Sequence, residues 1–281
     1  MNGYQMDTDI MREREASNLE TSPSRLAELA KDEDWRIRGI VASNENALVS
    51  TLAQLAEDGD YLVRENVASN ESTSPVVLAT LASDKEWTVR RQVASNIRTS
   101  PTTLAELALD DEWSVRHRVA SNRSTACSTL AQLVFDTSVA VREALVYNEN
   151  TPLDTLAQLA ADEDVCCAVA SIERISPDTL AQLANSPDVN ARCNVAQNKS
   201  TSSGTLAELA NDSAVDVRRA VARNKHTPSS VLASLARDED ADVRFYTARN
   251  PFTPIKVLEQ LVNDTAEFVR SAARIARYSL D

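Results

Sequence analysis

Glycine and aromatic residues are scarce in this chain. Of 281 residues only 4 are glycine, and Phe, Trp and Tyr together make up 4%. Doubly wound nucleotide-binding folds, barrels and sandwiches need glycine at their turns and β-branched or aromatic runs in their strands. The composition therefore argues against these classes and predicts a helical protein.

Three further absences restrict the functional class. No apolar run approaches the roughly 18 residues of a membrane-spanning helix, and residues 1–18 lack the apolar centre of a signal peptide. The 4 cysteines include no Cys-x-x-Cys pair, which favours free thiols in a reducing compartment. The net charge of −13 argues against non-specific binding to a phosphate backbone. We expect a cytoplasmic protein that binds neither membrane nor nucleic acid.

What the sequence does contain is an internal repeat with a period of 26 residues. If the first residue of each unit is position 0, Leu occupies positions 8 and 11 in all ten units; nine units have 26 residues and the sixth has 24. The units begin at Asn18, Asn44, Asn70, Asn96, Asn122, Asn148, Ile172, Asn198, Asn224 and Asn250. We expect a capping half-repeat at residues 1–17, a ten-repeat array at 18–275 and a tail at 276–281.

Each unit reads as two short helices, A and B. Thr-Ser before Pro is typical of an N-cap followed by the first residue of helix A. Helix B is expected to bury positions 17, 19, 23 and 24, and the Asn that follows it fits a left-handed C-cap. In the third unit the buried positions are Trp87, Val89, Val93 and Ala94. Both helices are short enough to tighten into a 3₁₀ form. One such unit cannot bury its apolar face alone, so the units must stack.

The run Leu104–Asn122, LAELALDDEWSVRHRVASN, together with the Thr-Ser-Pro that precedes it, resembles the leucine-rich repeat variant family. More distantly, the Asp and Val-Arg spacing is similar to HEAT-type repeats. The resemblance implies an all-α fold, a right-handed α-solenoid of ten two-helix repeats with an N-terminal capping helix. It names a fold and not an activity. Members with an iron–sulfur cluster hold it on a cysteine-rich N-terminal extension. Residues 1–17 contain no cysteine, so we expect no cofactor.

A charged pair recurs with the repeat. Asp occupies position 14 and Arg position 20 in nine of ten units. Cys166 replaces the arginine of the sixth unit, and Ser186 replaces the aspartate of the seventh. If each arginine binds the aspartate of the next unit, both partners of one pair are lost together and no buried charge is stranded. We therefore expect a structural ladder between units, formed by Arg38 and Asp58, Arg64 and Asp84, Arg90 and Asp110, and Arg116 and Asp136.

Aromatic and acidic residues also follow the repeat. Position 17 is Trp35, Tyr61, Trp87 and Trp113 in the first four units. We expect these side chains to fill the core, because valine replaces them in later units; the alternative is an exposed strip that stacks on bases, sugars or peptide rings. Acids gather at positions 13 to 18. They predict a solvated rim, and the alternatives are a cation-binding edge or a dock for a basic partner.

The cysteines carry one hypothesis. Cys167 and Cys193 share position 21 of adjacent units, and Cys166 precedes the first of them. A metal or cluster site needs three or four convergent thiolates, and at most two approach one another here. We expect free thiols and no metal, and a redox role stays open. The two histidines show no catalytic partner in the sequence, so no catalytic residue is assigned.

The sequence favours a non-enzymatic scaffold that binds a protein or peptide and is itself a monomer. In stacked two-helix arrays the second helix generally lines the concave face, and positions 18, 21, 22 and 25 vary most. The expected partner-binding residues are Arg91, Gln92, His117, Arg118, Glu143, Tyr147, Arg219, Arg223, Phe245, Tyr246 and Arg249. The alternatives are a nucleic-acid binder related to helical-repeat DNA glycosylases, and a structural protein that self-assembles through its ends.

Overall fold

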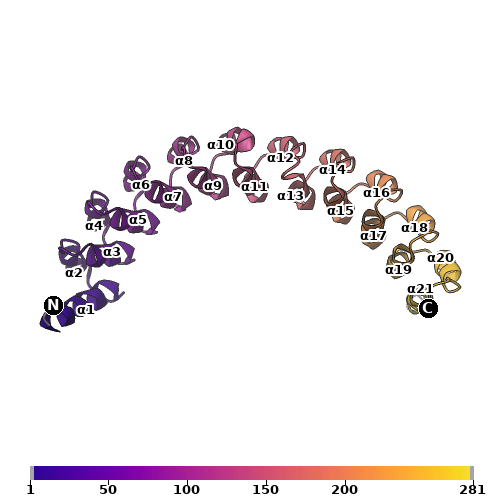
Figure 1. Ribbon diagram of the computed structural model, residues 1–281, viewed down its shortest axis with the longest axis horizontal. Coiled ribbons are helices and arrows are strands. Elements are labelled where there is room, and N and C mark those ends of the chain that lie inside the picture. The colour runs from indigo at the N-terminus through magenta and orange to yellow at the C-terminus, as the bar shows by residue number, and fades with distance from the viewer. Residues whose placement is uncertain (1–2, 279–281) are drawn as a thin grey trace. The chain divides into compact units, whose positions relative to one another are not determined.

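The computed structural model describes residues 3–278, with side chains from residue 10 onward, and every regular element in that range is a helix. By their contacts the residues form two compact units, Met1–Pro152 and Leu153–Asp281. Each unit is a stack of two-helix repeats, in which successive B helices pack against one another. Figure 1 shows the B helices of each unit on the inner side of its curve and the A helices on the outer side. The α-solenoid expected from the sequence is confirmed.

The first unit contains the capping helix and the first five repeats. Its A helices are α2 (Pro23–Leu29), α4 (Val49–Leu55), α6 (Pro75–Leu81), α8 (Pro101–Leu107) and α10 (Cys127–Gln132), the last followed by a 3₁₀ turn, Leu133–Phe135. Its B helices are α3 (Trp35–Ser43), α5 (Tyr61–Ser69), α7 (Trp87–Ser95), α9 (Trp113–Ser121) and α11 (Val139–Tyr147). The capping helix α1 (Gly3–Ser17) packs against α3. Arg12 of α1 forms an ion pair with Asp32 at 2.8 Å.

The second unit is built in the same way. Its A helices are α12 (Leu153–Leu159), α14 (Pro177–Leu183), α16 (Ser203–Leu209), α18 (Ser229–Leu235) and α20 (Ile255–Leu261). Its B helices are α13 (Cys166–Ser171), α15 (Val189–Gln197), α17 (Val215–Arg223), α19 (Ala241–Arg249) and α21 (Glu267–Tyr278). Helix α21 continues into the segment expected as a tail, whose residues 279–281 lie outside the described part of the chain. Residues 1 and 2 of the expected cap lie outside it as well.

Local sequence explains where the helices begin. Ser100 is the N-cap of α8, where its hydroxyl accepts a hydrogen bond from the Thr103 N–H, and Pro101 takes the first helical position. Asp60 caps α5 in the same manner through the Leu62 N–H at 2.8 Å. The repeated leucines form the core, and Leu104 has no exposed surface. Because the A helices span only 6 or 7 residues, their stability depends on this packing rather than on their own length.

The expected left-handed C-cap is wrong. Asn96 follows α7 in an extended conformation, with φ −70° and ψ 127°. None of the described residues, glycines included, has a positive φ. The asparagine is needed for its side chain instead, which reaches back to the preceding repeat.

The sixth repeat departs from the others because it lacks two residues between its helices. The chain turns at Asp162, whose carbonyl accepts hydrogen bonds from the N–H groups of Val165 and Cys166. Helix α13 therefore begins at Cys166 and has 6 residues, where most other B helices have 9. In this repeat Cys166 takes the position of the ladder arginine. No helix in the described range is long and apolar enough to cross a membrane.

Candidate binding surface on the B helices

The ladder joins consecutive repeats within the first to fifth and within the seventh to tenth. Arg64 donates from Nε and Nη2 to both carboxylate oxygens of Asp84, twenty residues further along the chain, at 2.5 and 2.9 Å. Its Nη1 donates to the Asp58 carbonyl oxygen of its own repeat at 2.8 Å. The ladder pairs, with their shortest N–O distances, are Arg38–Asp58 (2.5 Å), Arg64–Asp84 (2.5 Å), Arg90–Asp110 (2.5 Å), Arg116–Asp136 (2.6 Å), Arg192–Asp212 (2.7 Å), Arg218–Asp238 (2.7 Å) and Arg244–Asp264 (2.7 Å). This is the wiring between repeats that the sequence predicts.

The ladder carboxylates are held in their charged form. Burial alone would raise the pKa of Asp84, but the hydrogen bonds from Arg64 and from the Glu86 N–H outweigh it, so the pKa lies below its ordinary value. The pKa is lowered in the same way for Asp58, Asp110, Asp136 and Asp212. Because the side chains of Arg64 and Asp84 are only 9% and 7% exposed, this pair is part of the framework and is not available to a ligand.

A second ladder is made of asparagine. The side-chain amide of Asn96 donates to the carbonyl oxygens of Ala68 and Asn70 in the preceding repeat, at 2.8 and 3.0 Å. Its Oδ1 accepts a hydrogen bond from the N–H of Arg98 at 2.9 Å. The side chain thus satisfies three backbone groups at the end of a helix, where the helix itself cannot. The same positions recur as Asn44, Asn70, Asn122, Asn198, Asn224 and Asn250.

With both ladders committed to structure, the side chains left for a ligand lie at the variable positions of the B helices. In the first unit, His117, Glu143 and Tyr147 line one hollow of about 240 Å³ between α9 and α11. Burial, followed by the neighbouring Arg118, lowers the pKa of His117. Arg118 itself is exposed and does not line this hollow.

The other two expected residues of the first unit lie one repeat earlier. Arg91 stacks over the Trp87 ring with 5.2 Å between its guanidinium carbon and the ring centre, and approaches Glu65 at 3.8 Å. Gln92 donates to the same Glu65 carboxylate at 3.0 Å. These residues form a cluster on α5 and α7, and Glu65 is the member that sequence reasoning missed. It shares position 21 with Arg91, which is the signal that could have found it.

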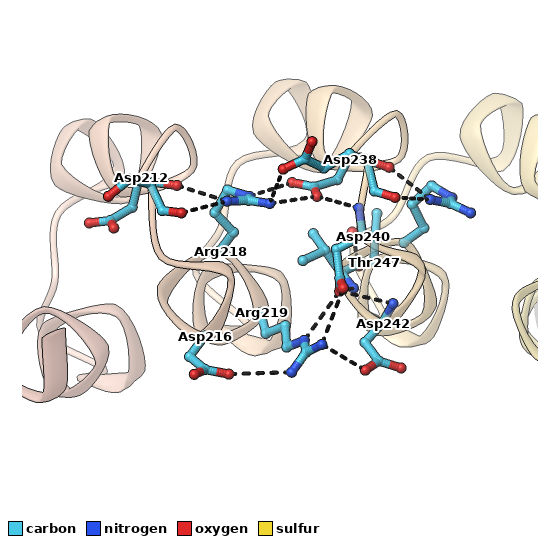
Figure 2. A network of polar contacts seen from close by, with 12 residues as sticks. Asp212, Asp216, Arg218, Arg219, Asp238, Asp240, Asp242 and Thr247 are labelled. Carbon is cyan, nitrogen blue, oxygen red and sulfur yellow. Dashed lines mark hydrogen bonds and ion pairs between the residues drawn. The ribbon is translucent and has the colours of Figure 1, made fainter.

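In the second unit, Arg219 is held by three carboxylates, as Figure 2 shows. It binds both oxygens of Asp240 at 3.2 Å, Asp242 at 2.8 Å and Asp216 at 3.3 Å. Asp240 is at the same time the N-cap of α19. Position 21 of one repeat therefore faces position 16 of the next. The sequence did not reveal this relation, because it joins residues 21 apart that belong to different units.

The remaining expected residues line two hollows of the second unit. Arg219, Arg223, Phe245 and Tyr246 line one of about 420 Å³, where Arg223 lies over the Tyr246 ring at 5.0 Å. Phe245 and Arg249 line a larger one of about 870 Å³ on α19 and α21. The other lining residues of the larger hollow are Glu267, Phe268, Ser271, Ala272, Ile275 and Ala276. Phe245 and Phe268 meet edge to face, with their ring centres 5.6 Å apart.

The expectation that the aromatic residues at position 17 fill the core is wrong. Trp35, Tyr61, Trp87 and Trp113 are 41%, 42%, 38% and 51% exposed. Position 17 is the first residue of the B helix in each of these four repeats, so part of each side chain stays in contact with solvent. The alternative reading, an exposed aromatic strip, agrees with these values.

The cysteines meet a carboxylate that the sequence did not indicate. Cys167 donates to the Oδ2 atom of Asp188 at 2.8 Å, and Cys166 is buried beside it. Burial, followed by this hydrogen bond, raises the pKa of the Cys167 thiol to about 12. Cys166, Cys167 and Asp188 place three potential ligand atoms within 4.8 Å of one another. The sequence led us to expect that at most two thiols approach one another. That expectation counted sulfur atoms alone, whereas the third potential ligand is a carboxylate oxygen of Asp188.

Comparison with known proteins agrees with the repeat. The leucine rich repeat variant family model matches residues 139–164 and 215–240. A solved structure described as a leucine-rich repeat variant with a novel repetitive structural motif is similar at 24% identity and a TM-score of 0.62, covering 79% of this chain and 88% of that one.

Two other solved structures are less similar. An engineered protein has 15% identity and a TM-score of 0.36, covering 95% of this chain and 92% of its own. The Escherichia coli protein YibA has 18% identity and a TM-score of 0.38, covering 83% and 93%. No curated protein sequence matches the chain. The family model matches two stretches of the array and the first solved structure shares its fold, so the expected resemblance to leucine-rich repeat variant proteins is confirmed.

Proposed function

We propose that the chain is a non-enzymatic scaffold that binds a peptide segment of a partner protein on the inner face of its B helices. The variable positions of these helices supply every residue of the smaller hollow in the second unit, and every residue of the larger one except Glu267 and Ala276. The residues that recur with little change form the leucine core and the two ladders. This division is typical of a repeat scaffold, in which conserved residues hold the repeats together and variable residues form the binding surface.

The observation that carries the proposal is the hollow of about 870 Å³ on α19 and α21. Its floor is apolar, with Phe268 46% and Ile275 69% exposed, and Arg249 and Glu267 provide polar groups at its edge. A largely apolar concave surface with a few polar groups is the usual character of a ligand site. Aromatic residues and arginine are also the residues that contribute most to protein interfaces.

Charge favours a peptide over nucleic acid. The three carboxylates around Arg219 neutralise one of the two cations that line the smaller hollow. A phosphate backbone binds where several cations are free to displace counterions. The net charge of −13 acts in the same direction. All 4 cysteines are free, which supports the reducing, cytoplasmic compartment expected for the protein.

The proposal is tested by panning a random peptide library on the full-length chain and measuring the selected peptides by calorimetry. We expect the Phe245→Ala and Arg249→Ala variants to weaken binding about tenfold or more, as for interface residues worth roughly 1–2 kcal/mol. The matched control is Phe252→Ala, an exposed aromatic residue in the loop before α20. Equal binding by all variants contradicts the proposal.

Two further measurements separate the alternatives. Fluorescence anisotropy with single- and double-stranded DNA is expected to show no salt-resistant binding. Sedimentation over a range of concentrations is expected to give the mass of one chain. A mass that rises with concentration and returns to that of one chain on Ile275→Asp supports self-assembly through α21 instead.

A further inference from the structure

Among the residues that the structure describes, one group of side chains could bind a metal ion, and it lies in the second unit. Cys166 and Cys167 open α13, and Asp188 lies at the start of α15 in the next repeat. Their sulfur and carboxylate oxygen atoms all lie within 4.8 Å of one another. A framework interaction is expected to recur along the array, whereas a binding site needs a single copy. Because this cluster does not recur in the described part of the array, it is a candidate binding site and not part of the framework.

Cys166 stands at the position where the nine other repeats hold the ladder arginine. Two repeats later, the positions of the two thiols are Arg218 and Arg219, and Asp240 corresponds to Asp188. Figure 2 shows Arg219 bound to Asp240. In the cluster the carboxylate is kept, as Asp188 of the seventh repeat, but thiols stand in place of the two guanidinium groups of the eighth repeat. A metal cation held by the two sulfur atoms would restore positive charge at this place.

Asp188 is already oriented for such a role. Its Oδ1 accepts a hydrogen bond from the N–H of Asn190 at 2.8 Å, which caps α15. Its Oδ2 is turned toward Cys167 at 2.8 Å. One oxygen is thus fixed by the helix, while the other is available as a ligand without rearrangement of the backbone.

Access to the cluster is open on one side. Cys166 lines a hollow of about 250 Å³, together with Asp162, Glu163 and Ser186. Ser186 stands in the position of a ladder aspartate, so this hollow lies where one rung of the ladder is missing. A cation and its remaining water ligand can reach Cys166 through this hollow.

We propose that Cys166, Cys167 and Asp188 bind a zinc ion, with the two thiolates and the Asp188 Oδ2 as ligands and water in the fourth position. Zinc accepts sulfur and carboxylate ligands in tetrahedral geometry, and thiolates select it over magnesium and calcium. On binding, each thiol releases its proton to solvent and the sulfur donates its electron pair to the metal. The raised pKa of Cys167 keeps that thiol protonated and unreactive in the metal-free protein.

The test uses the full-length chain, reduced with a phosphine and stripped of metal. Cobalt(II) serves as a visible probe, because thiolate ligands give it a sulfur-to-metal absorption band, and zinc(II) is then added to displace it. We expect one equivalent of cobalt to bind and to be displaced by zinc. The Cys166→Ser, Cys167→Ser and Asp188→Asn variants are expected to lose at least about tenfold in affinity, since even outer-shell partners of a metal cost about 10–100-fold.

Two features keep the experiment decisive. Asn is also a good N-cap, so Asp188→Asn preserves the start of α15 and a loss of binding there is not a loss of fold. Cys193→Ser is the matched control, because Cys193 occupies the same repeat position as Cys167 but is not part of the cluster. Absence of a stoichiometric thiolate–cobalt band in the parent chain overturns the proposal. An equal loss in the Cys193→Ser variant overturns it as well.

Discussion

Arg90 binds Asp110 through two hydrogen bonds, at 2.5 and 2.9 Å, and so connects α7 to the turn of the next repeat. The arginine also donates to the Asp84 carbonyl oxygen of its own repeat at 2.8 Å. One side chain thus ties together two turns that are 26 residues apart in the sequence. The ladder therefore holds one repeat against the next and also fixes helix B to the turn of its own repeat.

Removal of one partner of a rung is expected to cost more than removal of both. Arg64→Cys leaves Asp84 buried without its partner, which costs about 3–5 kcal/mol. The double variant Arg64→Cys with Asp84→Ser copies the natural combination of Cys166 and Ser186. Its cost should fall below the sum of the single variants by about 0.5–3 kcal/mol. Urea unfolding of all three measures the difference, with Arg25→Ala, an exposed ion pair to Glu15, as control. Strict additivity contradicts the inference.

Acid is expected to unfold the array by breaking the ladder. The pKa of the rung aspartates is lower in the folded chain than the value of about 3.9 in an unfolded one. A group whose pKa is lowered on folding contributes stability above its unfolded pKa and loses it as pH falls toward its folded pKa. Thermal melting should therefore change little between about pH 7 and pH 5 and fall steeply below about pH 4. A melting temperature that stays constant down to about pH 2 contradicts this account.

Loss of one asparagine of the ladder is expected to lower the free energy of unfolding about as much as loss of a core residue. In Asn96→Ala the carbonyl oxygens of Ala68 and Asn70 lose their donor, and the Arg98 N–H loses its acceptor. Because a buried polar group without a partner costs about 1–3 kcal/mol, we expect a loss of about 2 kcal/mol or more in urea unfolding. Asn211→Ala is the control, since its exposed amide bonds only to Ala207. If Asn96→Ala and Asn211→Ala lower the free energy of unfolding equally, the contacts of Asn96 between repeats do not contribute more than an exposed hydrogen bond.

The fluorescence of the three tryptophan residues is expected to be quenched by small molecules dissolved in the solvent. Trp35, Trp87 and Trp113 are partly exposed and follow Asp34, Glu86 and Glu112 directly in the chain. Neutral acrylamide should quench their fluorescence readily. Caesium should quench it more than iodide, because the adjacent carboxylates attract cations and repel anions. Quenching by none of the three would indicate buried rings, and equal quenching by the two ions would indicate that the acids do not act on them.

The sequence predicted the wiring of the ladder because two departures from the repeat coincide. Cys166 and Ser186 lie in consecutive units, and only pairing between repeats loses both members of one rung. The role of Asn96 was not predictable in the same way. Nine of the ten units keep the asparagine, and its partners are backbone groups that no side-chain substitution removes, so the one replacement, Ile172, does not reveal them. A C-cap preference also pointed to the wrong backbone conformation.

The exposed rings and the cysteine cluster were missed for different reasons. Val139 takes the position of Trp113 in the next repeat, which suggested a core site, but valine at the rim is itself 41% exposed. The approach of Asp188 to Cys167 depends on how one repeat packs against the next, and this distance cannot be predicted from the repeat period alone. The family resemblance supplied the architecture and left the surface undetermined.

The reach of the asparagine side chain has a consequence for how such arrays change in evolution. Asn96 finds its acceptors in Ala68 and Asn70, two backbone groups that any neighbouring unit presents irrespective of its side chains. A duplicated or deleted module therefore meets a ready partner at each new junction, and the chain can change its length by whole repeats without compensating mutations. The Cys166 and Ser186 pair is different, because a gene rearrangement that separates the two would leave one of them opposite a side chain that it does not fit.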